Sequence, residues 1–144
     1  MNLTRPRAAA GTEFPTEERP VLIAIVDDDE AILRALKRLL RGAGLTARTF
    51  TSGDQLLERL DALPSYAPDC VILDVHLVGA SGLEIHERLA RRARRVPVIF
   101  MTGYDEPPAR AHGLGAGAVA FLRKPFRSNL LFEALATAIG LSRP

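Results

Sequence analysis

The sequence predicts an α/β fold in which a doubly wound, five-stranded parallel sheet carries five helices on its two faces. Short apolar runs rich in β-branched residues alternate five times with segments whose apolar residues recur at three- and four-residue spacing. Consecutive β-α units of this kind imply parallel strands joined by right-handed crossovers. Polar residues also follow the apolar runs, as expected where a ligand gathers at the carboxyl ends of parallel strands.

The first β-α unit follows residues 1–20, an arm rich in Pro, Thr and Glu that lacks periodicity and that we expect to be flexible. Residues 21–26 are continuously apolar, which is typical of a strand buried on both faces. The helix after them is capped within residues 28–30 and ends at Gly42.

The second and third units contain two capping boxes, which mark helix starts. Residues 45–50 are more polar and predict a strand toward an edge of the sheet, and Ser52-Gly-Asp-Gln55 then opens the second helix. Residues 70–75 predict the third strand, and Ser81-Gly-Leu-Glu84 opens the third helix. Residues 96–101 predict the fourth strand.

The fourth helix should be short, because three glycines follow closely on the prolines that could begin it. We therefore expect residues 106–117 to be the most mobile segment of the domain. Residues 119–122 predict the fifth strand. Ser128 is expected to cap the fifth helix, and Gly140 is expected to end it.

Composition excludes several classes of protein. The 144 residues are 47% hydrophobic and 25% charged, a globular balance, and no apolar run approaches the roughly 20 residues that cross a bilayer. The single cysteine, Cys70, excludes an internal disulfide, and we expect it to be buried in a protein of the reducing cytoplasm. Basic residues gather at 88–95, but without aromatic or recognition motifs they predict a solvated helix end and not a nucleic-acid surface.

Polar residues at the strand ends should converge on one edge of the sheet. Three consecutive aspartates repel one another, by up to about 4 kcal/mol per close pair at an effective dielectric near 20, and a bound divalent cation would offset this cost. Carboxylates without histidine or thiolate partners suit Mg²⁺ or Mn²⁺. The residues concerned are Asp27, Asp28, Asp29, Thr51, Ser52, Asp74, Thr102 and Lys124.

A threonine and a lysine beside such a metal indicate a phosphoryl group, whose oxygens a hydroxyl and an ammonium can each bind. No serine, cysteine or histidine stands out as the acceptor, whereas Asp74 is isolated at the central strand. An attacking carboxylate would form an aspartyl phosphate, which is a known covalent intermediate.

With these residues assembled, the chain resembles a response-regulator receiver domain of bacterial two-component signalling. The motifs are VDDDE, ILDVHLVGASGLE, FMTGYDE and AVAFLRKPF, and the last two are most similar to receivers of LuxR-type regulators. The resemblance implies a receiver at residues 21–141, the flavodoxin-like strand order 2-1-3-4-5, and a signalling switch that catalyses only its own phosphorylation and dephosphorylation.

The resemblance also implies roles for the site residues. Asp74 would accept a phosphoryl group from a sensor histidine kinase or a phosphotransfer protein. Asp28 would bind the metal directly, Asp27 would assist through water, and Asp74 and the backbone carbonyl of His76 would complete the ligand set. Asp29 would then be a helix cap.

The remaining implied roles concern the switch. Thr102 would hydrogen-bond the phosphoryl group, and Lys124 would form an ion pair with it. The Lys124–Pro125 peptide bond resembles one that is cis in the family. Phe121 would change rotamer on activation and fill vacated space. An unknown output partner would read the surface of the fourth helix, fifth strand and fifth helix, and any contact with nucleic acid would require an output domain that this chain does not contain.

Some positions depart from the family pattern or are ambiguous. Val78 stands where a proline is usual, so the loop after Asp74 should be looser. His76 and Tyr104 are expected to tune the lifetime of the phosphate. His86 and His112 are expected to be surface residues.

Two other functions remain open from the sequence. A haloacid-dehalogenase-type phosphatase also uses an aspartyl phosphate, and Asp27-x-Asp29 imitates its first motif. That class, however, leaves Asp74 without a role and needs a cap for which this chain lacks room. The second alternative is a receiver-like interaction module that is never phosphorylated. We expect a stand-alone regulator rather than a receiver trimmed from a longer protein.

Overall fold

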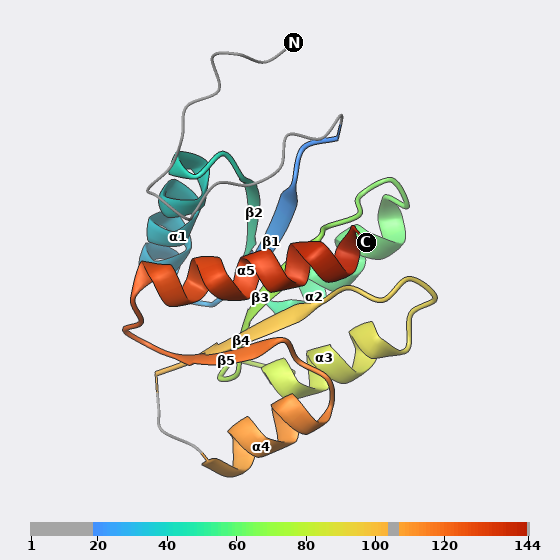
Figure 1. The fold of residues 1–144 in the computed structure, drawn as a ribbon. Coiled ribbons are helices and arrows are strands. Elements are labelled where there is room, and N and C mark those ends of the chain that lie inside the picture. Colours follow the sequence, from blue (N-terminus) through green and yellow to red (C-terminus); the bar gives the residue numbers. More distant parts are fainter. Residues whose placement is uncertain (1–18, 104–106, 144) are drawn as a thin grey trace.

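The computed structural model describes residues 19–103 and 107–143. Its sheet has five parallel strands in the order β2-β1-β3-β4-β5 (Figure 1). The strands are β1 (Leu22–Val26), β2 (Thr46–Phe50), β3 (Cys70–Asp74), β4 (Val98–Thr102) and β5 (Ala120–Arg123). The helices are α1 (Glu30–Gly42), α2 (Gly53–Ala62), α3 (Gly82–Ala90), α4 (Pro107–Gly115) and α5 (Ser128–Ser142). The predicted fold class and strand order are confirmed.

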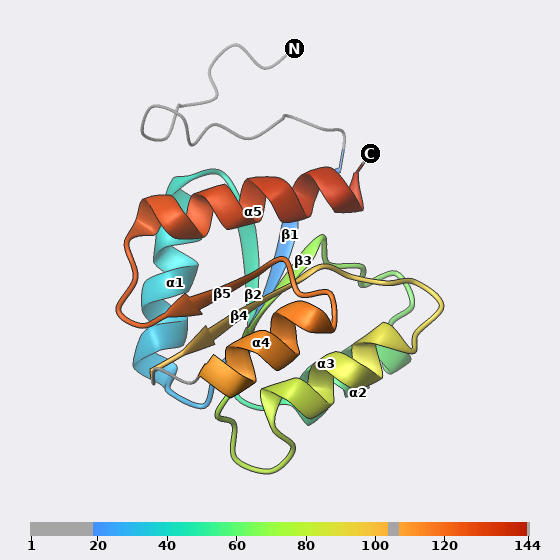
Figure 2. The ribbon, with the colours of Figure 1, turned by 60° about the horizontal axis from the view of Figure 1, so that its bottom comes forward.

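Two hydrophobic cores lie on opposite faces of this sheet. Helices α1 and α5 cover one face, and α2, α3 and α4 cover the other (Figure 2). In β1, Ile23 and Ile25 enter the first core, while Ala24 and Val26 enter the second. The continuous apolar run at the start of the domain follows from this arrangement, because both sides of β1 are buried.

The predicted limits of the strands are within two residues of the observed ones. Two expectations for α5 are wrong. Ser128 is the first residue of α5, the N-cap is Arg127, and no side chain caps this end. The helix also continues through Gly140 to Ser142. One glycine costs a helix only about 1 kcal/mol, and the residues beyond it are held in place by contacts to Asp69.

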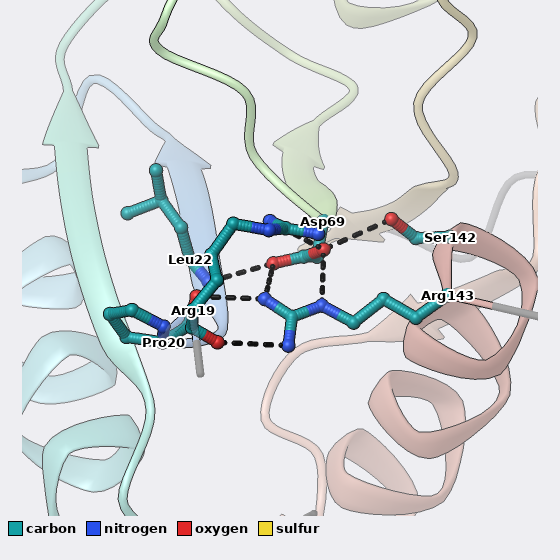
Figure 3. A network of polar contacts seen from close by, with 6 residues as sticks. All are labelled: Arg19, Pro20, Leu22, Asp69, Ser142 and Arg143. Atoms are coloured by element: carbon teal, nitrogen blue, oxygen red, sulfur yellow. Dashed lines mark hydrogen bonds and ion pairs between the residues drawn. The ribbon is translucent and has the colours of Figure 1, made fainter. Parts of the chain in front are cut away.

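Asp69 binds residues from both ends of the described chain (Figure 3). It precedes β3, whereas Asp74 is the last residue of that strand. Its fully buried carboxylate accepts hydrogen bonds from Arg143 Nε at 2.9 Å and from the Leu22 amide at 3.0 Å. Further donors are Ser142 Oγ at 3.1 Å and the Arg19 guanidinium at 3.4 Å. Burial alone would raise the pKa of Asp69, but the hydrogen bonds from Arg143 and its neighbours outweigh burial and lower it.

None of the helices within residues 19–103 and 107–143 is long and apolar enough to span a bilayer.

Candidate functional site

Three aspartates meet at the carboxyl ends of two neighbouring strands. Asp27 follows β1, Asp74 ends β3, and these strands pair in parallel with Val26 opposite Leu73. Carboxylate oxygens of Asp27, Asp28 and Asp74 lie within 4.8 Å of one another, close enough to share one metal ion. Asp27 and Asp74 are buried, and Asp28 is exposed. The predicted convergence of these three residues is therefore present.

Asp29, the third aspartate of the run, faces away from this cluster. Its carboxylate accepts hydrogen bonds from the amides of Ala31 at 2.9 Å and Ile32 at 3.4 Å, and so caps α1. Its own amide donates to Asp27 Oδ1 at 2.9 Å. The expected capping role of Asp29 is confirmed by these contacts.

Lys124 reaches the cluster from the loop after β5. Its ammonium lies 3.0 Å from Asp27 Oδ2 and 3.8 Å from Asp74 Oδ1. The Lys124–Pro125 bond is cis, as expected. The Lys124 amide donates to the carbonyl of Thr102 at 2.6 Å, which ties the lysine to the end of β4. Thr102 is itself buried, with 1% of its surface exposed.

Asp74 carries the strongest electrostatic perturbation of this site. Burial raises the pKa of Asp74 to about 6, and the Asp27 carboxylate adds to the rise. The ammonium of Lys124 acts in the opposite direction. The amide of His76 also lowers this pKa by donating to Asp74 Oδ1 at 3.3 Å. The carboxylate is therefore costly to ionise in the protein without a metal, chiefly because it is buried and secondly because the Asp27 carboxylate repels it.

Gly82 is a residue of the site that the sequence analysis did not assign. It is the first residue of α3, and a Cβ there would collide with the backbone carbonyl of Asp74. Its amide donates to the Val75 carbonyl at 3.0 Å. The glycine lets α3 lie directly against the backbone of the acceptor strand. The signal was available as a glycine immediately after the capping serine, in the confirmed Ser81–Glu84 capping box.

The remaining residues singled out from the sequence differ in their exposure to solvent. Phe121 is already buried, with 5% of its surface exposed. Val78 is 83% exposed, and Gly79 after it has φ of +88°, a left-handed conformation that glycine tolerates. His112 is exposed, as expected. Tyr104 lies outside the described residues.

Cys70 and His86 test two further expectations. Cys70 is a free, fully buried thiol, as predicted, and burial raises its pKa. The surface assignment of His86 is wrong, because only 7% of it is exposed and its ring packs on Phe100. It lies on the inward face of α3, one position from the buried Ile85.

The mobility expected at residues 106–117 stays a prediction. Residue 106 lies outside the described residues, and Pro107–Gly115 forms helix α4 despite its glycines.

A doubly wound sheet with an acidic cluster at the carboxyl ends of its central strands defines a class of α/β domain that binds its ligand at the topological switch point. A family model described as the response regulator receiver domain matches residues 23–136. The chain therefore belongs to the response-regulator receiver family, which is consistent with a phosphorylation-activated signalling switch. None of the comparisons supports the phosphatase alternative.

Individual relatives agree with this family. The chain is 39% identical to the response regulator protein TmoT of Ectopseudomonas mendocina over 99% of this chain and 63% of TmoT. It is 34% identical to the LuxR-type transcriptional regulatory protein FixJ of Bradyrhizobium diazoefficiens, over 85% of this chain and 58% of FixJ. The chain thus spans about six-tenths of the length of these relatives.

A solved structure supports the same assignment. The chain is 48% identical to a response regulator receiver protein from Burkholderia phymatum, with a TM-score of 0.75 over 85% of this chain and 96% of that one.

Proposed function

We propose that Asp74 is the phosphoryl acceptor of this receiver. The observation that carries the proposal is the position of its carboxylate at the end of the central strand, beside Asp27 and Asp28 and 3.8 Å from the Lys124 ammonium. The Asp27 carboxylate already accepts hydrogen bonds from the Lys124 ammonium and the Asp29 amide, and Asp28 is exposed. Of the two buried aspartates, Asp74 has the weaker contacts among the described residues: its one hydrogen bond comes from the His76 amide at 3.3 Å, whereas Asp27 accepts from Lys124 at 3.0 Å and from the Asp29 amide at 2.9 Å.

In the proposed reaction, a carboxylate oxygen of Asp74 attacks the phosphorus of a phosphohistidine on a sensor kinase or a phosphotransfer protein. The new O–P bond forms as the P–N bond breaks, and the departing imidazole keeps the electron pair and takes a proton. Lys124 neutralises charge on the phosphoryl oxygens, and the Thr102 hydroxyl donates a hydrogen bond to one of them. Hydrolysis by water returns the carboxylate and inorganic phosphate.

The oxygen donors at this edge fit a hard divalent cation. Asp27, Asp28 and Asp74 would hold Mg²⁺ or Mn²⁺ with the backbone carbonyl of His76, because carboxylate and carbonyl oxygens are the ligands these ions prefer. When bound, the ion supplies positive charge that offsets the repulsion of the carboxylates and the charge of the phosphoryl oxygens.

The further parts of the proposal concern the role of the chain. Residues 21–141 act as the receiver, a range close to the described elements from Leu22 to Ser142. The domain acts in the cytoplasm on no substrate other than its own acyl phosphate. An output partner reads the surface of α4, β5 and α5, and Phe121 is the switch residue beneath it. His76 and Tyr104 tune the lifetime of the phosphate.

Intact mass spectrometry tests the acceptor. Incubation with Mg²⁺ and acetyl phosphate should add one phosphoryl group to the wild-type chain and none to Asp74→Asn. Asp54→Asn is the matched control, because Asp54 is an exposed carboxylate on α2 and should leave the mass gain intact. Phosphorylation of the Asp74→Asn protein would refute the assignment. Multiple turnovers of p-nitrophenyl phosphate without a stable phosphorylated species would favour the phosphatase instead.

A further inference from the structure

The Phe121 ring is buried in a site lined by Phe100 of β4 and Gly113 of α4, which we call the seat. Its ring is 5.7 Å from that of Phe100 between centroids, with the planes tilted at 43°. The two residues are directly opposite each other on β5 and β4. Phe121 also lacks the hydroxyl with which a tyrosine could hydrogen-bond to solvent or to a partner. Nothing in its chemistry therefore favours a ring outside the core.

Phe100 is supported from its other side by His86 on α3. The centroids of these two rings are 5.2 Å apart, and their planes are nearly perpendicular at 88°. Such edge-to-face pairs contribute roughly 0.5–1.5 kcal/mol beyond the burial of their surface. Phe100 is fully buried, and His86 is 7% exposed. Three rings thus form a row from β5 through β4 to α3.

Gly113 of α4 closes the seat above the two phenylalanines. A Cβ at this position would lie 3.0 Å from two carbons of the Phe100 ring and 3.4 Å from the Phe121 ring. Helix α4 therefore contacts both rings through bare backbone, and a larger residue would have to displace the helix or a ring. A glycine inside a helix costs about 1 kcal/mol relative to alanine, a cost that this close approach explains.

We propose that His86 and Gly113 are positioning residues that hold Phe121 buried before phosphorylation, with His86 bracing Phe100 and Gly113 admitting both rings beneath α4. The inference rests on the proposed function, in which Phe121 is the switch residue. It changes the expected order of events, because the ring does not have to enter the core on activation. A change at Thr102 would instead reach the partner surface through the contact that the seated rings already make with α4.

The packing of His86 on Phe100, which we call the brace, should depend on the charge of the imidazole. Burial lowers the pKa of His86, Glu87 on the same helix opposes that effect, and His112 of α4 reinforces it. Two basic residues, Arg94 and Arg95, line the same hollow as His86. A protonated imidazole would be desolvated and close to three cationic or titratable residues, and only the Glu87 carboxylate would stabilise it. Acid should therefore loosen the brace and the seat.

Nuclear Overhauser contacts of selectively labelled phenylalanine rings test the proposal in the unphosphorylated chain. Wild type at pH 7.5 should show contacts from the Phe121 ring to Phe100 and to the Gly113 Hα. His86→Ala should weaken them and accelerate amide exchange at Phe121 roughly two- to tenfold, the range that loss of one edge-to-face pair supports. Gly113→Ala should shift α4 or the Phe100 ring by a few tenths of an ångström, and so change the intensity of the contacts between Phe121 and α4.

The pH profile separates positioning from a merely structural role. The ring contacts of wild type should weaken as His86 protonates, whereas His86→Phe should keep them at every pH because it retains an aromatic brace without a titrating group. His112→Gln, which removes an exposed histidine of α4, should leave the contacts in place at pH 7.5. Unchanged Phe121 contacts and exchange in His86→Ala would overturn the proposal, and so would an exposed Phe121 ring in the wild-type chain.

The same samples distinguish this inference from the proposed function. All these variants should still gain one phosphoryl group from acetyl phosphate. Loss of that gain in wild type would refute the acceptor while leaving the ring contacts to be judged on their own. Normal phosphorylation with a mobile Phe121 would refute the positioning roles alone.

Discussion

Replacing Asp74 with asparagine should stabilise the metal-free protein. The folded chain raises the pKa of Asp74 from 3.8 to about 6, so ionising this carboxyl costs more in the folded state than in the unfolded one. The difference is about two pH units, and each unit corresponds to about 1.36 kcal/mol, which gives about 3 kcal/mol at pH 7.5. The Asp74→Asn side chain carries no charge and can still accept the His76 amide.

This gain depends on pH in a direction that the raised pKa fixes. Below about pH 4 the carboxyl is protonated in both the folded and the unfolded chain, so the charge contributes no difference. As the pH rises, the unfolded chain loses its proton first, and the folded wild type is progressively destabilised until about pH 6. The advantage of Asp74→Asn should therefore grow between about pH 4 and pH 6 and then level off.

Urea denaturation in EDTA at several pH values measures the effect, and thermal melting should show a rise of roughly 6–12 °C at pH 7.5. Asp54→Asn is the control, because its carboxylate is 64% exposed and its removal should change stability by less than about 0.5 kcal/mol. Equal stability of wild type and Asp74→Asn at pH 7.5 would refute the reasoning, and so would an advantage that does not shrink in acid.

Four other outcomes follow from the same contacts. Asp28→Asn should melt higher than wild type without metal and lose the stabilisation that Mg²⁺ confers, as thermal scans with and without the ion would show. Lys124→Met should lower the free energy of unfolding by roughly 1–3 kcal/mol in urea, because it leaves two buried carboxylates without their cation. Asp69→Asn should lower the free energy of unfolding, measured in urea at pH 7, by roughly 2–4 kcal/mol because it weakens the hydrogen bonds with Arg143. Since the pKa of Asp69 is lowered in the folded chain, this difference from wild type should disappear as the pH falls below about 4. Wild type should also lose stability as the pH falls through about 6.5, since the unfolded His86 takes up a proton before the folded one, and urea titrations of His86→Phe should lack that component.

Much of the site could be predicted from the sequence because its residues stand at the ends of recognisable strands. The carboxyl ends of parallel strands share one edge of the sheet, so Asp27, Asp74 and Lys124 had to approach one another once the strand order was known. The capping role of Asp29 was equally accessible, because it depends on the residues two and three positions along the chain.

The misses have a common physical cause. The surface expectation for His86 is wrong because its burial depends on packing against Phe100, which belongs to a strand distant in the sequence. The end of α5 was misplaced because the contacts that extend it past Gly140 come from Asp69, which precedes β3. From the sequence, Gly82 and Gly113 indicate only lower helix stability. Their close approach to the backbone of Asp74 and to the rings of Phe100 and Phe121 is visible only in the folded chain.

Short-range patterns of burial and hydrogen bonding specify the five β-α units, the polar residues that follow the strands and the acidic chemistry of the site, so these features could be predicted before the fold was known. The ionisation of Asp74, the burial of His86 and the packing of Phe121 became evident only in the folded chain. Those properties depend on desolvation and on contacts between segments far apart in the chain, and they arise only when the helices cover both faces of the sheet.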